Sequence, residues 1–192
     1  MAAKSSGANR RRITIALSGD VMTGRGIDQV LPRPCDPRLH ESHVASARDY
    51  VALAERASGP IPRPVDLAYV WGEAPAARRR LKADAWIVNL ETAVTRSEDP
   101  APKGINYRMS PENAACLSAA GIDCCTLANN HVLDWGMAGL LETLETLPAL
   151  GLKTAGAGRT AADAAAPAIL ELAAGRVLVF AFGAPSSGIP PD

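Results

Sequence analysis

The chain has 192 residues, which suits one domain, and 47% of them are hydrophobic, enough to bury a core. Its 20 basic and 20 acidic residues cancel, so no net charge would draw it to nucleic acid or to an anionic membrane. No stretch approaches the roughly 20 consecutive apolar residues of a membrane span, and no signal peptide is recognisable, which predicts a cytoplasmic protein without a membrane segment. The 4 cysteines lack zinc-site spacing and are expected to be free thiols.

The first part of the chain predicts one strand followed by a long irregular segment. Residues 1–11 are expected to be a disordered tail, and residues 12–18 form a β-rich run that ends in a polar turn. Between residues 31 and 64 the chain is rich in proline, with helical composition only over 45–57. We therefore expect a long excursion there, of the kind that is usually functional or mobile.

The rest of the chain alternates between helical and strand patterns, which are delimited by capping residues, glycine stops and apolar periodicity. The expected helices cover 75–82, 111–120, 137–150 and 160–166, the expected strands cover 85–90, 122–128 and 152–155, and a hairpin covers 168–172 and 176–182. This order predicts an α/β fold with a largely parallel sheet, which becomes mixed at the edge where the hairpin joins. The domain is expected to span 12–183, with a loop over 184–192.

Polar residues with metal-binding chemistry follow three of the predicted strands. Asp20 follows the first strand, Glu91 the second, and Asn130 with His131 the third. Ligands of open α/β sheets bind beyond the carboxyl ends of the strands, so these side chains are expected to form one site. Two carboxylates, an amide and an imidazole suit a divalent cation such as Mn, Mg, Zn or Fe. Each residue alone is more often a turn or core residue, but their coincidence at three strand ends favours a metal site.

Four strings of residues resemble the CapA family, which is named for bacterial poly-γ-glutamate capsule synthesis. They are GDVMTGR over 19–25, NLE over 89–91, ANNHVLDWG over 128–136 and GAGRTAADAAAP over 156–167. The strings occur in the family's order, and the resemblance covers residues 13–183. It implies a metallophosphatase-like layered α/β domain.

The resemblance also implies roles for the residues at the strand ends. Asp20 matches the first-strand metal aspartate, and Glu91 stands where metallophosphoesterases place a bridging carboxylate. Asn130 and His131 match an asparagine–histidine pair in which the amide binds metal and the imidazole polarises or protonates the phosphate group. The implied metal ligands are thus Asp20, Glu91 and Asn130, with His131 as a catalytic residue.

Two further residues are candidates for the same site. Arg25 is expected to clamp phosphate as a catalytic residue, because a guanidinium fork matches phosphate oxygens. Asp134 has two open interpretations: it orients His131 from behind, or it caps the helix over 137–150.

The sequence departs from the family pattern in two ways. Met22 stands where typical metallophosphoesterases have the histidine of an aspartate-x-histidine motif, and the later histidine motifs of the family are missing. The other two histidines, His40 and His43, lie in the proline-rich segment and are expected to be exposed. A two-metal site needs more ligands than these. We therefore expect an N-terminal portion of the family domain, truncated at its C-terminus, with a partial site.

Two functions are consistent with these residues. The first is a metal-dependent hydrolase of the phosphoesterase type that acts on a small molecule or an anionic polymer in capsule biosynthesis, although this chain by itself is expected to be inactive. The second is a non-catalytic accessory domain that binds an anionic polymer or a partner protein of capsule synthesis. A third interpretation, a dinucleotide fingerprint over 156–161, is disfavoured because a hairpin follows it instead of another strand–helix–strand unit.

Overall fold

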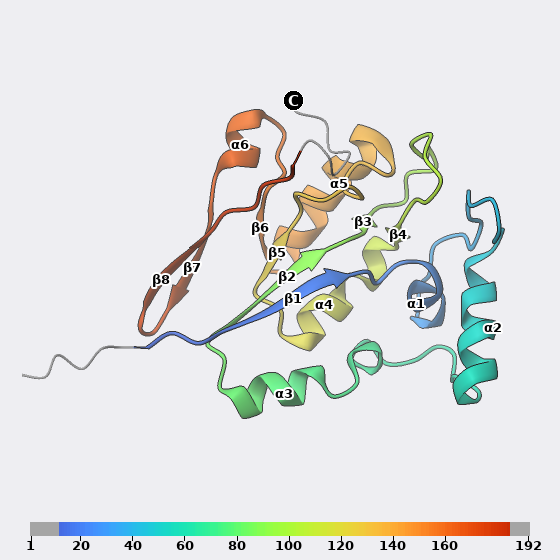
Figure 1. Ribbon diagram of the computed structural model, residues 1–192, viewed down its shortest axis with the longest axis horizontal. Helices are drawn as coiled ribbons and strands as arrows, with labels where there is room; N and C mark the ends of the chain where they lie inside the picture. The colour runs from blue at the N-terminus through green and yellow to red at the C-terminus, as the bar shows by residue number, and fades with distance from the viewer. Residues whose placement is uncertain (1–11, 185–192) are drawn as a thin grey trace, which may run out of the picture.

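The computed structural model describes residues 12–184, and a parallel sheet forms its centre. The sheet has four strands in the order β1-β2-β5-β6, and all neighbouring pairs are parallel (Figure 1). These strands are β1 (Ile15–Val21), β2 (Ala85–Leu90), β5 (Cys124–Thr126) and β6 (Lys153–Ala155). The predicted α/β class with a largely parallel sheet is therefore confirmed.

Helices connect the strands, most of them where the sequence predicts them. They are α1 (Arg25–Val30), α2 (Ala47–Ser58), α3 (Ala74–Leu81), α4 (Ala115–Ala120), α5 (Gly136–Ala149) and α6 (Ala161–Ala165), with 3-10 turns η1 (Tyr69–Trp71) and η2 (Pro111–Asn113). The helix α1 was not expected, because it has only 6 residues and its N-cap, Gly24, contributes no side-chain hydrogen bond. The single helix predicted over 111–120 is divided into η2 and α4.

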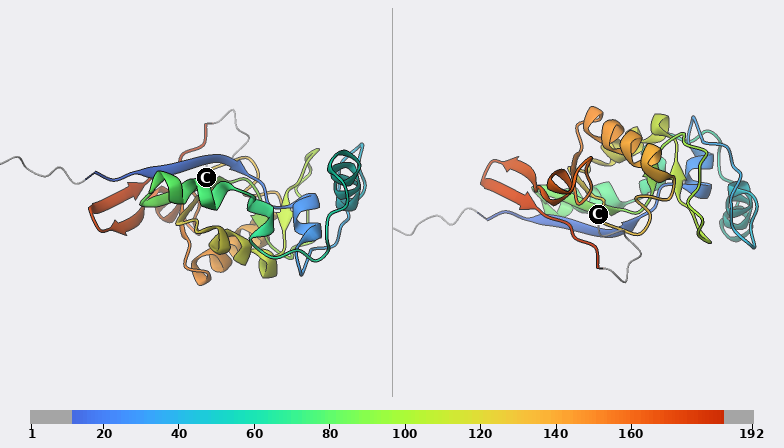
Figure 2. Two further views of the ribbon diagram at one scale, coloured as in Figure 1. Left: turned by 90° about the horizontal axis from the view of Figure 1, so that it is seen from below. Right: turned by 90° about the horizontal axis from the view of Figure 1, so that it is seen from above.

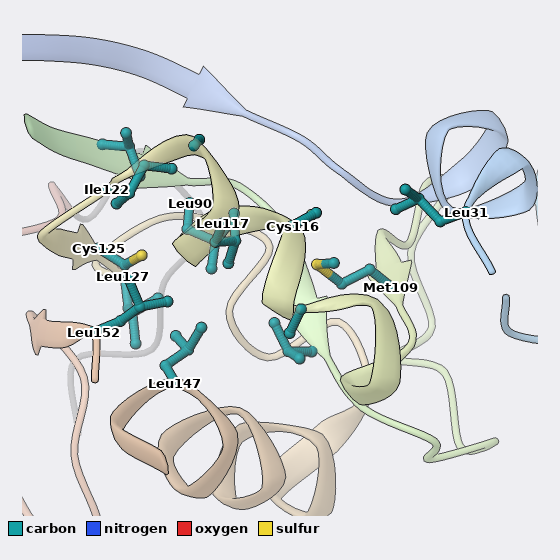
Figure 3. Packing of buried hydrophobic residues seen from close by; sticks show 14 of the residues in the cluster. Leu31, Leu90, Met109, Cys116, Leu117, Ile122, Cys125, Leu127, Leu147 and Leu152 are labelled. Atoms are coloured by element: carbon teal, nitrogen blue, oxygen red, sulfur yellow. The ribbon is translucent and has the colours of Figure 1, made fainter. Parts of the chain in front are cut away.

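The two faces of the sheet pack against different elements. Alternate residues of β2 point to opposite faces, so Trp86 and Val88 belong to the larger apolar cluster and Ile87 to the smaller one. The larger cluster holds α4 and α5 on one side of the sheet (Figure 2), through leucines such as Leu117 and Leu147 (Figure 3). Burial of such a leucine side chain contributes about 1.5–3 kcal/mol to folding.

The terminal hairpin forms a sheet of its own. Its strands, β7 (Ala168–Leu172) and β8 (Gly175–Val179), pair with each other in antiparallel fashion, and in residues 12–184 neither joins the parallel sheet. Leu170 and Val179 of the hairpin pack in the smaller apolar cluster with Ile87 of β2. The expectation of a mixed sheet edge is therefore wrong: apolar burial, not a hydrogen-bonded ladder, attaches the hairpin to the sheet.

The proline-rich excursion, residues 31–64, carries the predicted helix as α2 and is tied down by a buried carboxylate in α1. Asp28 is 1% exposed and accepts hydrogen bonds from the backbone N–H groups of Cys35 (2.7 Å) and Ser110 (3.1 Å) and from Nδ2 of Asn113 (2.7 Å). Burial raises the pKa of Asp28, and these donors act in the opposite direction. One aspartate thus joins α1, the start of the excursion and η2.

A second, very short parallel pair lies beyond the end of β2. Its strands, β3 (Ala93–Val94) and β4 (Arg108–Met109), have 2 residues each, too few for periodicity to predict them. The loop between them contains Lys103 and Tyr107, which both reach the polar site described below.

No helix in the described part of the chain is long and apolar enough to cross a membrane. The cysteines, Cys35, Cys116, Cys124 and Cys125, are free, as the sequence predicts. The tail predicted over residues 1–11 and residues 185–192 of the predicted terminal loop lie outside the described residues.

Candidate functional site

The carboxyl ends of β1 and β2 point toward α1 and α2 (Figure 1), and the predicted site residues lie at this end of the sheet. The β1–β2 register shifts between Ser18 and Val21, and within this bulge Asp20 adopts the left-handed conformation with φ 65°. The Oδ1 atom of Asp20 accepts a hydrogen bond of 2.8 Å from Nδ2 of Asn89 in β2. The bulge thus turns an exposed aspartate toward the neighbouring strand.

Asn89 joins the two carboxylates that the sequence predicts as metal ligands. Its Nδ2 also donates to Oε2 of Glu91 at 2.8 Å, so Asp20 and Glu91 share one amide group. Burial raises the pKa of Glu91, and the adjacent carboxyl group of Asp20 raises it further, while His131 lowers it. Two like charges therefore lie close together with only a neutral amide between them.

The orientation of this amide is fixed by a second asparagine. Nδ2 of Asn129 donates to the carbonyl oxygen of Leu90 (2.9 Å) and to Oδ1 of Asn89 (3.0 Å), and Oδ1 of Asn129 accepts the backbone N–H of His131 (3.0 Å). A carbonyl can only accept and an N–H can only donate. The backbone groups at both ends therefore dictate that Asn89 presents its NH₂ group to the carboxylates.

His131 and Asp134 form a buried pair next to these amides. Nδ1 of His131 lies 2.6 Å from Oδ2 of Asp134, and the two residues are 6% and 0% exposed. Asp134 contacts His131 and does not cap α5, whose N-cap is Trp135. Its orienting role stays a prediction. With the Nδ1 proton directed at a carboxylate, the lone pair of a neutral His131 is on Nε2, which lies 3.9 Å from Oε1 of Glu91.

Lys103 and Tyr107 complete the surroundings of Asp134. Nζ of Lys103 contacts Oδ1 of Asp134 at 2.6 Å, and the backbone N–H of Tyr107 donates to Oδ2 at 2.5 Å. The Tyr107 ring also stacks on the His131 imidazole, with ring centroids 3.8 Å apart and planes inclined by 19°. Asp134 is therefore fully partnered, and His131 is held at Nδ1 and on one face.

The remaining predicted residues lie at different distances from this centre. Asn130 is exposed, and its carbonyl oxygen accepts a 2.7 Å hydrogen bond from Lys103. Arg25 is separated from His131 by the Tyr107 ring and is ion-paired with Glu41. The predicted clamp role stays a prediction.

The other two histidines lie elsewhere. His40 packs edge-on against Trp135 with ring centroids 5.9 Å apart, and the exposed His43 lies 3.6 Å from Glu41. The two glycines of the disfavoured dinucleotide fingerprint have packing roles. A Cβ on Gly156 would meet the Cβ of Ala128 at 2.7 Å, and one on Gly158 would overlap α6.

Sequence reasoning missed four residues of the site: Asn89, Asn129, Lys103 and Tyr107. Asn89 could have been found, because it lies two residues before Glu91 and alternate strand residues share a face. Lys103 and Tyr107 come from a loop without periodicity and carry no such signal.

The oxygen donors at this edge suit a divalent cation, although they are few. In the part of the chain that the structure describes, no group of three or more His, Cys, Asp or Glu side chains is close enough to hold a metal ion. Asp20 and Glu91 nonetheless offer two hard carboxylate ligands, and the pKa of Glu91 is raised first by burial and then by Asp20, two effects that a bound cation would oppose.

Comparison with known proteins gives the family. A family model described as "Bacterial capsule synthesis protein PGA_cap" matches residues 14–192. Two proteins named "Probable polyglutamine synthesis accessory protein", from the CDC 1551 and H37Rv strains of Mycobacterium tuberculosis, are 43% identical over 180 residues. That alignment covers 93% of this chain and 47% of each relative.

A more distant relative, "Uncharacterized protein y4sH" of Sinorhizobium fredii, is 41% identical over 101 residues, or 50% of this chain and 22% of its own. The chain thus spans about half the length, or less, of these relatives. The family match covers nearly all of the chain, in agreement with the motifs at its strand ends. The chain therefore belongs to the bacterial capsule synthesis family PGA_cap, the CapA family that its sequence resembles.

Proposed function

We propose that this chain belongs to an accessory protein of poly-γ-glutamate synthesis and that its strand-end site hydrolyses a phosphoester or peptide-like bond with the help of a divalent cation. Family membership and the names of the mycobacterial relatives support the role in synthesis. The observation that carries the hydrolytic part is the buried His131–Asp134 pair, in which Nε2 of His131 lies 3.9 Å from Oε1 of Glu91.

In this proposal His131 acts as the general acid. Water attacks the phosphorus or carbonyl carbon and releases one proton to solvent, the bond to the leaving group breaks, and the leaving oxygen or nitrogen takes a proton from Nε2 of protonated His131. Solvent then returns a proton to Nε2. Asp134 stabilises the imidazolium through its contact with Nδ1, and Lys103 contacts the other oxygen of Asp134. A positioned acid of this kind contributes roughly 10²- to 10⁴-fold to a rate.

Asp20 and Glu91, with the exposed amide of Asn130, are the residues that would hold the cation. Oxygen donors of this kind favour Mg or Mn, while Zn and Fe would also accept the nearby imidazole. A bound cation would supply charge stabilisation and a more acidic water molecule. Asn89 contributes by holding both carboxylates in place.

The test is Mn²⁺ binding by calorimetry and metal analysis of the purified 192-residue chain, together with hydrolysis of p-nitrophenyl phosphate and of a γ-glutamyl peptide. We expect Asp20→Ala and Asn130→Ala to lose Mn²⁺ binding. Asp66→Ala, which removes an exposed aspartate far from the strand ends in sequence, is the control and should bind normally. A wild-type chain that neither binds Mn²⁺ nor hydrolyses either substrate would contradict the proposal.

One observation favours the alternative of a non-catalytic domain that binds an anionic polymer. A hollow of about 320 Å³ is lined by three arginines and three carboxylates: Arg33, Arg96, Arg108, Asp36, Glu98 and Glu112. Arg33 has no ion pair in the described residues, so it could receive a polymer carboxylate. Poly-γ-glutamate binding without Mn²⁺, abolished by Arg33→Ala and unaccompanied by hydrolysis, would favour this alternative.

A further inference from the structure

Four planar groups form one continuous stack that ends on His131. The Arg25 guanidinium lies over the Tyr50 ring, 4.9 Å from its centroid, and over the Tyr107 ring, 4.6 Å from its centroid. Tyr107 in turn stacks on the His131 imidazole at 3.8 Å. The stack therefore runs from α2 through α1 to the histidine at the end of β5.

A buried ion pair anchors the middle of this stack. Nη2 of Arg25 lies 2.5 Å from Oε1 of Glu41, whose side chain is only 1% exposed, and the Tyr50 hydroxyl donates to Oε2 of Glu41 at 2.8 Å. Nε and Nη2 of Arg25 and Oε1 of Glu41 are buried and have no hydrogen-bond partner in the described residues, so the Arg25–Glu41 contact is an ion pair without hydrogen-bond geometry. One ion pair and two aromatic faces therefore hold the guanidinium, an arrangement in which ring contact carries more weight than hydrogen bonds.

Tyr107 touches both members of the proposed acid pair. Its ring covers His131, its backbone N–H donates to Asp134, and its carbonyl oxygen accepts a 3.0 Å hydrogen bond from Nε1 of Trp135. Its backbone is thus fixed from two sides. On the other side of the ring lies the guanidinium of Arg25, which supports the ring against the imidazole.

We propose that Arg25 and Tyr107 are positioning residues for His131. A single hydrogen bond at Nδ1 leaves an imidazole free to pivot about that bond. Contact with the Tyr107 ring, supported from behind by Arg25 and Glu41, removes that freedom and keeps Nε2 directed at Glu91. This gives Arg25 a role different from the predicted phosphate clamp, and it gives the proline-rich excursion a role in the site. The catalytic meaning of the inference rests on the proposed function, but its geometric content does not.

NMR spectroscopy of the His131 ring protons tests the geometry without any substrate. The stacked Tyr107 ring shifts these protons by its ring current, so the shift reports how closely the two rings lie. We expect Arg25→Met, which leaves Tyr107 in place, to reduce the shift, and Tyr107→Phe to retain it. Arg63→Met is the matched control, because it breaks another arginine–glutamate pair of the excursion, with Glu55, that has no stacked histidine.

Enzyme kinetics test whether the position of the His131 ring affects catalysis. If the chain hydrolyses a substrate, Arg25→Met and Tyr107→Leu should lower kcat by roughly 10- to 100-fold with little change in KM, and Tyr107→Phe should restore kcat. Unchanged His131 shifts in a folded Arg25→Met variant would overturn the inference. A wild type without hydrolysis, but with shifts that respond to Arg25→Met, would remove the proposed function and leave the positioning role standing. Should Tyr107→Leu not fold, Arg25→Met and Tyr107→Phe still decide the question.

Discussion

Asp28 and Asp134 are both almost completely buried, at 1% and 0% exposure, yet the groups around them differ in kind. Asp28 is surrounded by donors that do not titrate, two backbone N–H groups and the amide of Asn113. Asp134 is bonded to an imidazole and an ammonium group, those of His131 and Lys103, and to one backbone N–H. Only the second cluster leaves an atom, Nε2 of His131, that can exchange a proton with a ligand. Burial of a carboxylate therefore does not by itself mark a chemical site; the nature of its donors does.

The sharpest way to test the structural half of this comparison is Asp28→Ala. The substitution removes the acceptor of two buried donors, at about 1–3 kcal/mol each, and of one part-buried donor, the N–H of Cys35, so we expect the free energy of unfolding to fall by about 3 kcal/mol or more. Urea unfolding measures this loss. The control is Asp66→Ala, which frees one exposed backbone N–H, that of Ala68, and should cost about 1 kcal/mol or less. Similar losses in both variants would mean that Asp28 does not tie the excursion down.

The substitution Asp134→Asn tests the other half of the comparison, namely that Asp134 belongs to a site that exchanges a proton. An amide carries no charge to stabilise the imidazolium, and its NH₂ group would meet a donor in either orientation, Lys103 at Oδ1 or the N–H of Tyr107 at Oδ2, so we expect kcat to fall by about 10²-fold or more. Nitrogen NMR shifts of His131 measure the tautomer independently of activity. Asp84→Asn, at an exposed aspartate that accepts the backbone N–H of Thr14, is the control. An unchanged kcat in a folded Asp134→Asn variant would break the distinction between the two aspartates.

Glu91→Gln should stabilise the protein in the absence of a cation. Burial and then Asp20 raise the pKa of Glu91 above 4.5, so its proton stabilises the fold below that pH and this contribution is lost as the pH rises through the raised pKa. We therefore expect Glu91→Gln to be more stable than wild type near neutral pH, with the difference vanishing at low pH. Urea unfolding between about pH 4 and pH 8 measures it. A variant that is less stable than wild type at neutral pH would contradict this sign.

The smallest effect is expected at Glu112, whose pKa is lowered, whereas that of Glu91 is raised. The Ser110 hydroxyl, and then Arg96, lower the pKa of Glu112 to about 2. The ionised carboxylate therefore stabilises the fold fully above pH 4.5, and this stabilisation is lost as the pH falls through the lowered pKa. Because Arg96 is largely exposed, Glu112→Gln should cost about 0.5 kcal/mol or less at neutral pH. Urea unfolding at high and low salt measures this, with Glu98→Gln as the control. A loss that does not shrink with salt would argue against an ion-pair origin.

Much of the fold follows from local patterns in the sequence. The apolar runs of β2 and β5 and the amphipathic repeat of α5 predict their elements to within a few residues. The short elements α1, β3 and β4 escape such patterns, because tertiary contacts rather than periodicity define them. The hairpin was recognised, but its attachment was not, since a strand's sequence does not distinguish packing on a face from pairing at an edge.

The residues of the site also fall into two groups, those that strand patterns could predict and those that only tertiary contacts bring in. That Asp20 and Glu91 lie together could be inferred from parallel strands, whose carboxyl ends share one edge. The partners of His131 could not, because Lys103 and Tyr107 arrive from a loop whose path is set by the short β3–β4 pair. Asn129 was passed over for its neighbour Asn130, and only the backbone conformation decides which of two adjacent amides points inward.

The one-way chain of amides from His131 through Asn129 to Asn89 has a consequence for the speed of cation uptake. The NH₂ group of Asn89 occupies one oxygen of each carboxylate, Oδ1 of Asp20 and Oε2 of Glu91. Turning that amide over would require Asn129 to turn as well, against the backbone of Leu90 and His131. A cation that bound through Oδ2 of Asp20 and Oε1 of Glu91 would therefore leave Asn89 in place, whereas one that needed all four oxygens would load slowly, at a rate set by the displacement of Asn89 rather than by diffusion.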